Sequence, residues 1–317
     1  MEILVKVVLL VVGFVMLIKG ADWFVEGASK VADKFGIPQL VIGLTIVAFG
    51  TSAPEAAVSI SAALKGSESV NIAIGNVVGS NIINVLVILG ITAIIIPLAV
   101  QKSTLCYEIP GVIVASILLP ALGYFDGSLS RVDGIILWIG MIVYLVYLLM
   151  MAKKGVAPTE EVEEAKESDN ILKLIVLILI GGALIIFGSD VTVDAACDLA
   201  KIFGMSERVI GLTIVALGTS LPELITSITA GIKGKADIAI GNIVGSNLFN
   251  ILFVLGTAAI VTPIPYAKNF KIDTIIMIVA VVLLLLGVCN KERKLKRPAG
   301  GVLLATYIGY LAYILLQ

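Results

Sequence analysis

The stretch Gly50-Thr51-Ser52-Ala53-Pro54-Glu55 lies inside a long apolar segment and occurs a second time as Gly218-Thr219-Ser220-Leu221-Pro222-Glu223. Each copy places a carboxylate and two hydroxyl groups beside a proline. Ionisable groups are costly inside an apolar, membrane-like segment, so their presence there indicates a function. The segments around the two copies predict the fold.

The composition is that of an integral membrane protein. Of the 317 residues, 59% are hydrophobic and only 14% are charged, which is too few charges to cover a soluble domain of this length. Ten apolar segments have room for the roughly 20 residues that a membrane-spanning helix needs. Their approximate ranges are 4–24, 39–64, 71–97, 105–124, 132–152, 171–200, 208–232, 237–262, 270–289 and 299–316.

The rare residue types exclude several kinds of site. The chain has no histidine, and its three cysteines (Cys106, Cys197 and Cys289) are widely spaced. A zinc, copper or iron centre and a disulfide framework are therefore not expected. No nucleophile–base pair is evident, so we expect no enzyme and no cofactor. No basic patch beyond the short run 291–297 points to nucleic acid, and that run is better explained as an anchor at lipid headgroups.

A polar, acid-rich linker at 153–170 divides the chain into two repeats of five spans, 1–152 and 171–317. An odd number of spans leaves the chain on the opposite side of the membrane, so the second repeat enters upside down. Inverted repeats place equivalent segments face to face near the membrane midplane. We therefore expect Glu55 and Glu223 to approach each other there.

The similarity of the two halves is extensive. Residues 42–48 are identical to residues 210–216, at an offset of 168, and residues 75–84 match residues 241–250 at an offset of 166. The matched positions are mostly Gly, Asn, Ser, Thr and Glu, so shared hydrophobicity does not explain them. The sequence thus predicts an all-α membrane protein of ten helices in two inverted repeats.

Lysine and arginine counts predict the orientation, because they favour cytoplasmic loops. The loops after spans one, three, five, seven and nine carry fourteen such residues, against seven on the other side. We therefore expect the protein in the cytoplasmic membrane, with the linker in the cytoplasm and both termini outside.

The repeated stretch predicts a broken helix. Thr51 and Glu55 are four residues apart and share a helix face. Pro54 has no N–H, so the carbonyl of Gly50 loses its helical partner and the helix opens. Hydroxyls, a carboxylate and free carbonyls, including that of Ala48, then gather in one place. The second copy repeats this arrangement at 216–223.

A polar stripe follows each broken helix, and it offers further oxygen atoms. Asn76, Ser80 and Asn84 share one helix face, as do Asn242, Ser246 and Asn250. Carboxylate, hydroxyl, amide and carbonyl oxygens are hard ligands that suit Na⁺ and Ca²⁺. Two carboxylates neutralise one Ca²⁺ or two Na⁺, which makes the two kinds of ion mutually exclusive.

Structural interpretations compete with functional ones at some of these positions. A single buried Glu beside a Pro could be structural, but its symmetric duplication disfavours that interpretation. The spacings Gly75–Gly79 and Gly241–Gly245 favour helix packing. Asn81 and Asn247 could brace helices or bind ions. Asp22, Asp190, Asp194 and Asp198 lie near helix ends, where an interfacial role is favoured.

At these motifs the sequence resembles the sodium/calcium exchanger family of the cation/Ca²⁺ antiporters, particularly its small prokaryotic members. The Gly-Thr-Ser-x-Pro-Glu and Gly-Asn-x-x-Gly-Ser-Asn-x-x-Asn motifs, once per half, look like the two α-repeats of that family. The resemblance covers essentially the whole chain. It implies alternating access, with spans one and six as a gating pair that slides against the remaining helices.

The resemblance also implies a set of ion ligands. Carried over by position, these are Glu55 and Glu223 as carboxylates, Thr51, Ser52, Thr219 and Ser220 as hydroxyl or carbonyl donors, Ala48 and Ala216 as carbonyl donors, and Ser80, Asn84, Ser246 and Asn250. Many relatives have Asp at one or both positions equivalent to Asn84 and Asn250. The departure leaves this site with two acids and leaves the involvement of K⁺ open.

The first functional hypothesis is exchange of Na⁺ for Ca²⁺, in the direction of Ca²⁺ extrusion, with no protein partner evident. Exchange of Ca²⁺ for H⁺, or K⁺-dependent exchange of Na⁺ for Ca²⁺, could use the same two carboxylates. A passive channel is disfavoured, because two acids on inverted repeats form a closed site rather than an axial ring.

Overall fold

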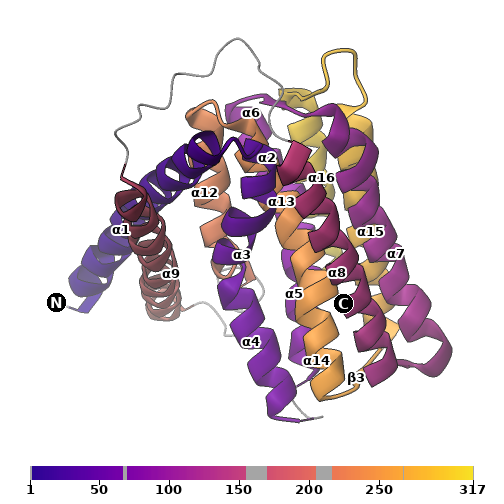
Figure 1. The fold of residues 1–317 in the computed structure, drawn as a ribbon. Helices are drawn as coiled ribbons and strands as arrows, with labels where there is room; N and C mark the ends of the chain where they lie inside the picture. The colour runs from indigo at the N-terminus through magenta and orange to yellow at the C-terminus, as the bar shows by residue number, and fades with distance from the viewer. Residues whose placement is uncertain (1, 67–69, 155–169, 205–215, 267, 317) are drawn as a thin grey trace.

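The computed structural model describes residues 2–66, 70–154, 170–204, 216–266 and 268–316, and it is built almost entirely of helices (Figure 1). The first half contains α1 (Glu2–Phe35), α2 (Gln39–Ile42), η1 (Gly43–Val47), α3 (Ala48–Thr51), α4 (Ala53–Leu64), α5 (Asn71–Ile83), η2 (Asn84–Leu89), α6 (Gly90–Ile95), β1 (Leu98–Ala99), η3 (Thr104–Glu108), α7 (Ile109–Asp126), β2 (Ser128–Leu129) and α8 (Arg131–Lys154). The second contains α9 (Ile171–Ile202), α11 (Ala216–Gly218), α12 (Leu221–Ile232), α13 (Ala236–Phe249), η5 (Asn250–Leu255), α14 (Gly256–Val261), β3 (Ile264–Pro265), α15 (Lys268–Val288), β4 (Lys294–Leu295) and α16 (Arg297–Leu316).

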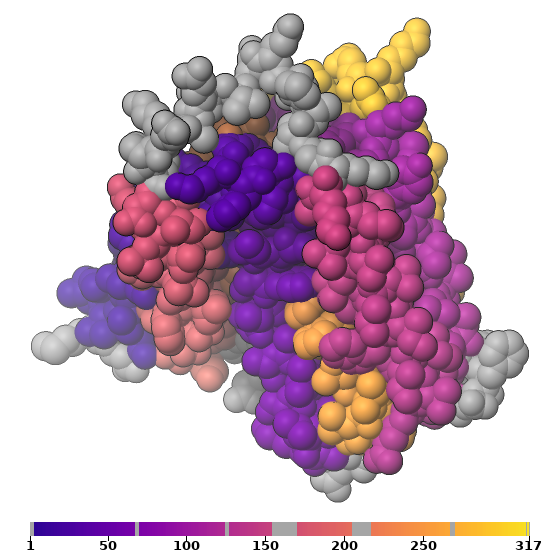
Figure 2. Space-filling view, in the orientation of Figure 1, coloured from indigo at the N-terminus to yellow at the C-terminus, as the bar shows by residue number. Residues whose placement is uncertain are grey.

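Helices α1 and α9 form a closely packed pair at one side of the larger helical body (Figures 1 and 2). Their glycines meet in two crosswise contacts: a Cβ added at Gly20 would lie 2.8 Å from the Gly181 carbonyl oxygen, and one at Gly13 would lie 3.0 Å from that of Gly188. Small residues at such crossings let two backbones approach closely. The pair is therefore held by backbone contact along both helices.

Both helices are longer than the sequence predicted, and α1 continues to Phe35 instead of ending near residue 24. An ion pair between Glu26 and Lys30, one turn apart, supports the added turns. Gly36, with a φ of +61°, follows α1, and its counterpart Gly204 follows α9 with a φ of +80°. A glycine in this left-handed conformation is a common helix terminator.

The continuous helices α5–η2–α6 and α13–η5–α14 form the centre of the larger body. Most of their residues are buried, whereas the other long helices expose much of their apolar surface. Helices α7, α8, α15 and α16 surround this centre on the side away from α1 and α9 (Figure 1). A buried centre with an apolar exterior is the arrangement expected of a protein surrounded by lipid.

Two short antiparallel ladders join the halves, and the sequence analysis did not predict them. Strand β1 pairs with β4, with Leu98 opposite Leu295, and β2 pairs with β3, with Leu129 opposite Ile264. Each strand of the first half is equivalent to one of the second at the offset of 166. The ladders are therefore one contact made twice, with the halves exchanged.

The number of membrane spans is confirmed in part. Within the described residues, seven helices are long and apolar enough to cross a membrane, and the bent pair Gln39–Thr51 and Ala53–Leu64 gives up to eight. The predicted span 208–232 falls partly on residues outside the described ranges, and the predicted span 299–316 corresponds to α16. The count of ten spans and the inverted topology stay predictions. The linker at 153–170 also stays a prediction, since most of its residues lie outside the described ranges.

Candidate functional site

The helix around the first repeated stretch is broken where the sequence predicted. Helix α3 ends at Thr51, α4 begins at Ala53, and the segments before and after Ser52 are bent by 52°. Pro54 lies in the first turn of α4, where a missing N–H costs nothing. The second copy is broken in the same way, because α11 ends at Gly218 and α12 begins at Leu221.

The predicted site residues gather where the broken helices meet the buried centre. Ser52 Oγ donates a 2.8 Å hydrogen bond to Glu223 Oε1, and Ser246 Oγ donates to the carbonyl of Ala48 at 3.4 Å. Thr219 is half-buried, and Ala216 begins α11, although its side chain is not described. The remaining predicted residues are buried: Ala48, Thr51, Ser52, Glu55, Ser80, Asn84, Ser220, Glu223, Ser246 and Asn250.

The two carboxylates lack a full set of hydrogen-bond donors. Among the described residues, six buried oxygens of the predicted set have no donor: Glu55 Oε1 and Oε2, Glu223 Oε2, Asn84 Oδ1, Asn250 Oδ1 and Ser220 Oγ. Buried polar atoms are normally satisfied, so a cluster without donors indicates a ligand. Five of these oxygens are carboxylate or amide acceptors, which calls for a cation or a proton.

The electrostatics support the same conclusion. Glu55 and Glu223 are 1% and 0% exposed, and each lies in the first turn of the helix that follows one of the two breaks, α4 and α12. No lysine or arginine is among the buried side chains of the described residues, so this part of the chain brings no buried positive side chain to the two carboxylates. No group of three or more His, Cys, Asp or Glu side chains gathers in the described part of the chain. The donor set is therefore hard oxygen with two acids.

Two asparagines hold the backbone of the carboxylate residues. Asn76 Nδ2 donates to Ser59 Oγ at 2.9 Å and to the Glu55 carbonyl at 3.2 Å. In the second half, Asn242 Nδ2 donates in the same way to Ser227 Oγ, at 2.9 Å, and to the Glu223 carbonyl, at 3.4 Å. Ser59 and Ser227 were missed from the sequence, although their offset of 168 marks them as repeat equivalents.

The asparagines left open by the sequence brace the two central helices. Asn81 Nδ2 donates to the backbone carbonyl of Asn247 at 3.1 Å, and Asn247 Nδ2 donates to that of Asn81 at 3.3 Å. Close packing also occurs at Gly241 and Gly245, where an added Cβ would lie within 3.0 Å of the backbone at Leu44. The packing role expected of this glycine pair is confirmed. The same expectation is wrong for the first pair, because an added Cβ would meet only the Phe270 ring, at 3.8 Å, at Gly75 and nothing within 4 Å at Gly79.

A serine on α9 supplies a contact that the sequence analysis did not find. Ser189 Oγ donates a 2.9 Å hydrogen bond to the carbonyl of Gly218, four residues before Pro222. This is the carbonyl that the proline deprives of its helical donor. The equivalent of Ser189 in the first half is Ala21, which has no hydroxyl, so the repeat pattern offers no signal for this bond.

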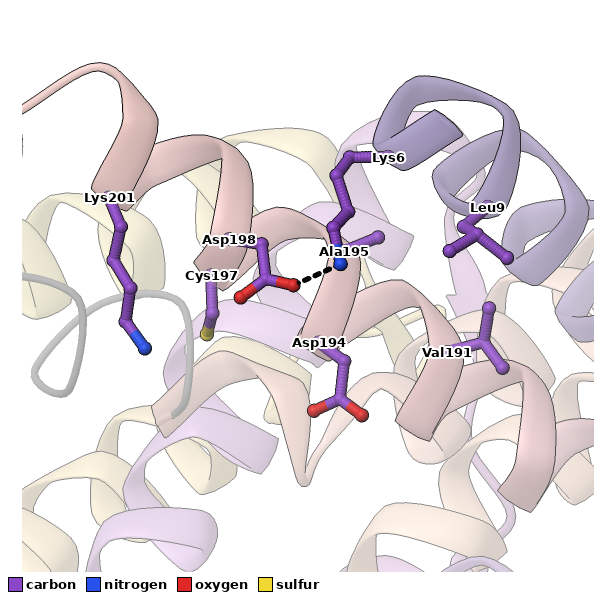
Figure 3. Close-up of a pocket in the computed structure, with 8 residues that line it drawn as sticks. All are labelled: Lys6, Leu9, Val191, Asp194, Ala195, Cys197, Asp198 and Lys201. Carbon is purple, nitrogen blue, oxygen red and sulfur yellow. Dashed lines mark ion pairs between the residues drawn. The ribbon is translucent and has the colours of Figure 1, made fainter. Parts of the chain in front are cut away.

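Two aspartates of α1 and α9 form ion pairs with lysines. Asp22 pairs with Lys233, just beyond α12, at 2.6 Å. Asp198 pairs with Lys6 at 2.6 Å in a surface pocket of about 360 Å³ that also contains Asp194 (Figure 3). None of the predicted ligands lines this pocket.

Known proteins resemble this chain over nearly its whole length. A family model described as "Sodium/calcium exchanger protein" matches residues 5–150 and 173–316. The chain is 40% identical over 317 residues to the "Putative antiporter CaxA" of Alkalimonas amylolytica, covering 97% of this chain and 98% of the relative. It is 32% identical over 349 residues to the "Sodium/calcium exchanger MaX1" of Methanosarcina acetivorans, covering 98% and 99%.

A solved structure is similar over the same length. The sodium-calcium exchanger NCX_Mj, soaked with 10 mM Na⁺ and without Ca²⁺, superposes with a TM-score of 0.83 at 33% sequence identity. The superposition covers 98% of this chain and 99% of that chain. Family, length and fold agree, and the chain belongs to the sodium/calcium exchanger family, a family of membrane antiporters.

Proposed function

We propose that this protein exchanges Na⁺ for Ca²⁺ by alternating access at a midplane site built from both repeats. The observation that carries the proposal is the pair Glu55 and Glu223, both buried without a buried lysine or arginine among the described residues and with three of their four oxygens lacking a donor. An uncompensated pair of buried charges is unfavourable, so a bound cation stabilises the site.

The charge of the site explains exchange in place of co-transport. Two carboxylates balance one Ca²⁺ or two Na⁺, and binding both sets together would leave excess positive charge in a buried site. The amides of Asn84 and Asn250 add oxygen atoms without charge. Ca²⁺ takes 6–8 oxygen ligands, and the ten predicted ligand residues that lie buried can supply that number.

A second candidate is exchange of Ca²⁺ for H⁺ at the same site. The unpartnered oxygens of Glu55 can accept protons as readily as cations. K⁺-dependent exchange of Na⁺ for Ca²⁺ would need room for one more cation, and the described residues bring no third carboxylate to this site. Sodium exchange is favoured because the named relative MaX1 and the structural match NCX_Mj are sodium/calcium exchangers.

The orientation of the protein is part of the proposal. Fourteen lysines and arginines against seven favour the 153–170 linker in the cytoplasm and both termini outside. In the cytoplasmic membrane the inward Na⁺ gradient would drive extrusion of Ca²⁺ through such an exchanger.

The deciding experiment measures ⁴⁵Ca²⁺ flux in proteoliposomes with Na⁺, K⁺ and H⁺ gradients imposed one at a time. We expect uptake to follow the Na⁺ gradient and to saturate with Ca²⁺. Flux driven by the pH gradient alone would show that H⁺, and not Na⁺, is the ion exchanged for Ca²⁺. Flux that needs no counter-ion would refute an antiporter.

Glu55→Gln and Glu223→Gln test the site itself. At about 4 Å and an effective dielectric constant near 20, one carboxylate attracts a divalent ion by about 8 kcal/mol, and retaining a third of that after desolvation is worth about a hundredfold in affinity. We expect each variant to lose Na⁺-dependent flux. Glu108→Gln is the matched control, because Glu108 is equally buried but accepts a hydrogen bond from Tyr147 away from the site. Flux retained in both site variants would overturn the assignment.

A further inference from the structure

Four asparagines of the central helices form one network, and two of them, Asn81 and Asn247, have no role in the proposed function so far. Asn81 and Asn247 each commit their Nδ2 group to the backbone carbonyl of the other. Asn84 Nδ2 donates to Asn247 Oδ1 at 3.0 Å, and Asn250 Nδ2 donates to Asn81 Oδ1 at 3.1 Å. All four side chains are buried, at 0% or 1% exposure.

The orientation of each amide in this network is fixed by its chemistry. A backbone carbonyl can only accept, so Asn81 and Asn247 must present their NH₂ groups to it. Their Oδ1 atoms are then acceptors and require a donor from the neighbouring amide. Asn84 and Asn250 must therefore turn their own NH₂ groups toward the network, which leaves Oδ1 on the other side of each amide.

The oxygens on the far side of the two amides, one in Asn84 and one in Asn250, both lack a hydrogen-bond donor. Asn84 Oδ1 and Asn250 Oδ1 are buried, and no donor among the described residues reaches them. Each belongs to the residue that begins a π-helical turn, in η2 and η5 respectively. Such turns occur frequently at functional sites. The network thus presents one unpartnered amide oxygen from each repeat.

We propose that Asn81 and Asn247 are positioning residues that lock Asn250 and Asn84, respectively, with their carbonyl oxygens presented to the cation. The proposal rests on the proposed function. In it, each positioning residue orients an asparagine of the other repeat. A free amide can rotate by 180° and offer an NH₂ group, which repels a cation. The hydrogen bonds from Asn250 to Asn81 and from Asn84 to Asn247 exclude that orientation, so a bound cation faces the amide oxygen and not the NH₂ group.

The same lock explains why a neutral residue suits positions 84 and 250. An ionised Asp at position 250 would set a carboxylate oxygen against Asn81 Oδ1, with no hydrogen between them. The amide of Asn250 instead donates from Nδ2 to Asn81 Oδ1 and keeps Oδ1 as an acceptor on its other side. The network therefore favours a site whose charge rests on Glu55 and Glu223.

A set of double-mutant cycles tests the crosswise pairing. Asn81→Ala and Asn250→Ala should each raise the KM for Ca²⁺ about tenfold, the equivalent of one hydrogen bond of about 1.4 kcal/mol, with little change in kcat. The double variant should be no worse than Asn250→Ala, because Asn81 acts through Asn250. Asn247 and Asn84 should show the same coupling.

The matched control uses residues that are neighbours on one helix. Asn81→Ala and Asn84→Ala lie one turn apart, but Asn81 Oδ1 serves Asn250, so their effects on KM should multiply. Coupling within one helix and none across the repeats would overturn the proposal. Additive effects for every pair, or loss of kcat at unchanged KM, would overturn it as well.

Equilibrium binding of ⁴⁵Ca²⁺ to the purified protein keeps the two proposals apart. The same cycles run on binding constants require no transport. If wild-type protein binds Ca²⁺ and shows the crosswise coupling but fails to exchange it, the lock stands and the exchange function falls. If exchange is normal and the coupling is absent, the lock falls alone.

Discussion

Two adjacent glycines on α9 allow a controlled test of the contact between α1 and α9. A Cβ added at Gly181 would lie 2.7 Å from Phe24 N and 2.8 Å from the Gly20 carbonyl oxygen. A Cβ added at Gly182 would lie 3.6 Å or more from the Phe24 ring, an ordinary contact. Gly181→Ala and Gly182→Ala thus apply one chemical change on two sides of the same helix.

The expected magnitude follows from backbone atoms that cannot move aside. Overpacking a well-packed contact costs about 1–3 kcal/mol. Alanine gains up to about 1 kcal/mol in helix propensity over glycine, but that gain applies to both variants and cancels in the comparison. We expect Gly181→Ala to be less stable than Gly182→Ala by about 1–3 kcal/mol.

Thermal unfolding of the two purified variants in detergent measures this difference. With an unfolding entropy of about 2.1 cal/mol/K per residue, one kcal/mol corresponds to about 1.5 °C in Tm for a chain of 317 residues, so a separation of about 1.5–4.5 °C is expected. Equal Tm values would refute the close crossing of α1 and α9. A lower Tm for Gly182→Ala would show that the helix faces are assigned incorrectly.

Two further predictions concern single contacts. Asp22→Asn removes the ion pair with Lys233, whose side chains are 39% and 31% exposed. An exposed ion pair contributes about 0.2–1 kcal/mol, so its loss should shift the equilibrium between the conformations open to the two sides of the membrane by up to about fivefold. The ratio of the exchange rates measured with Ca²⁺ supplied from one face and from the other reports this shift. An unchanged ratio would contradict the prediction. Ser52→Ala deletes the donor to Glu223 and should lower ion-free stability by about 1.5–3 kcal/mol, whereas Ser220→Ala, whose hydroxyl has no partner among the described residues, should not.

The broken helix could be predicted from the sequence because its cause is local. Pro54 cannot donate to a carbonyl four residues earlier, and that holds in any fold. The internal repeat also predicted that the two copies of the stretch come together, although it named Glu55 and Glu223 as the meeting residues and not the bond from Ser52 to Glu223. Symmetry thus supplied long-range information that a single segment does not contain.

Other features depend on tertiary packing that no local pattern records. The π-helical turns at Asn84 and Asn250 require a shifted backbone bond that residue types do not specify. The strands β1 to β4 are two residues long, too short for an alternating pattern. The Ser189 bond breaks the repeat symmetry, so the comparison of halves concealed it.

Asp22 and Lys233 form an ion pair, whereas the residues equivalent to them in the internal repeat do not. The equivalent residues at the offset of 168 are Asp190 and Lys65, both exposed and without an ion pair among the described residues. The strand pairs, the Gly20–Gly181 and Gly13–Gly188 contacts and the Asn81–Asn247 bonds are made in both copies, but this ion pair is made once. Exchanging the roles of the halves would break one such pair and form another of the same chemistry. Two conformations related in this way would differ little in intrinsic free energy, so the ion-free protein would populate both to a similar extent.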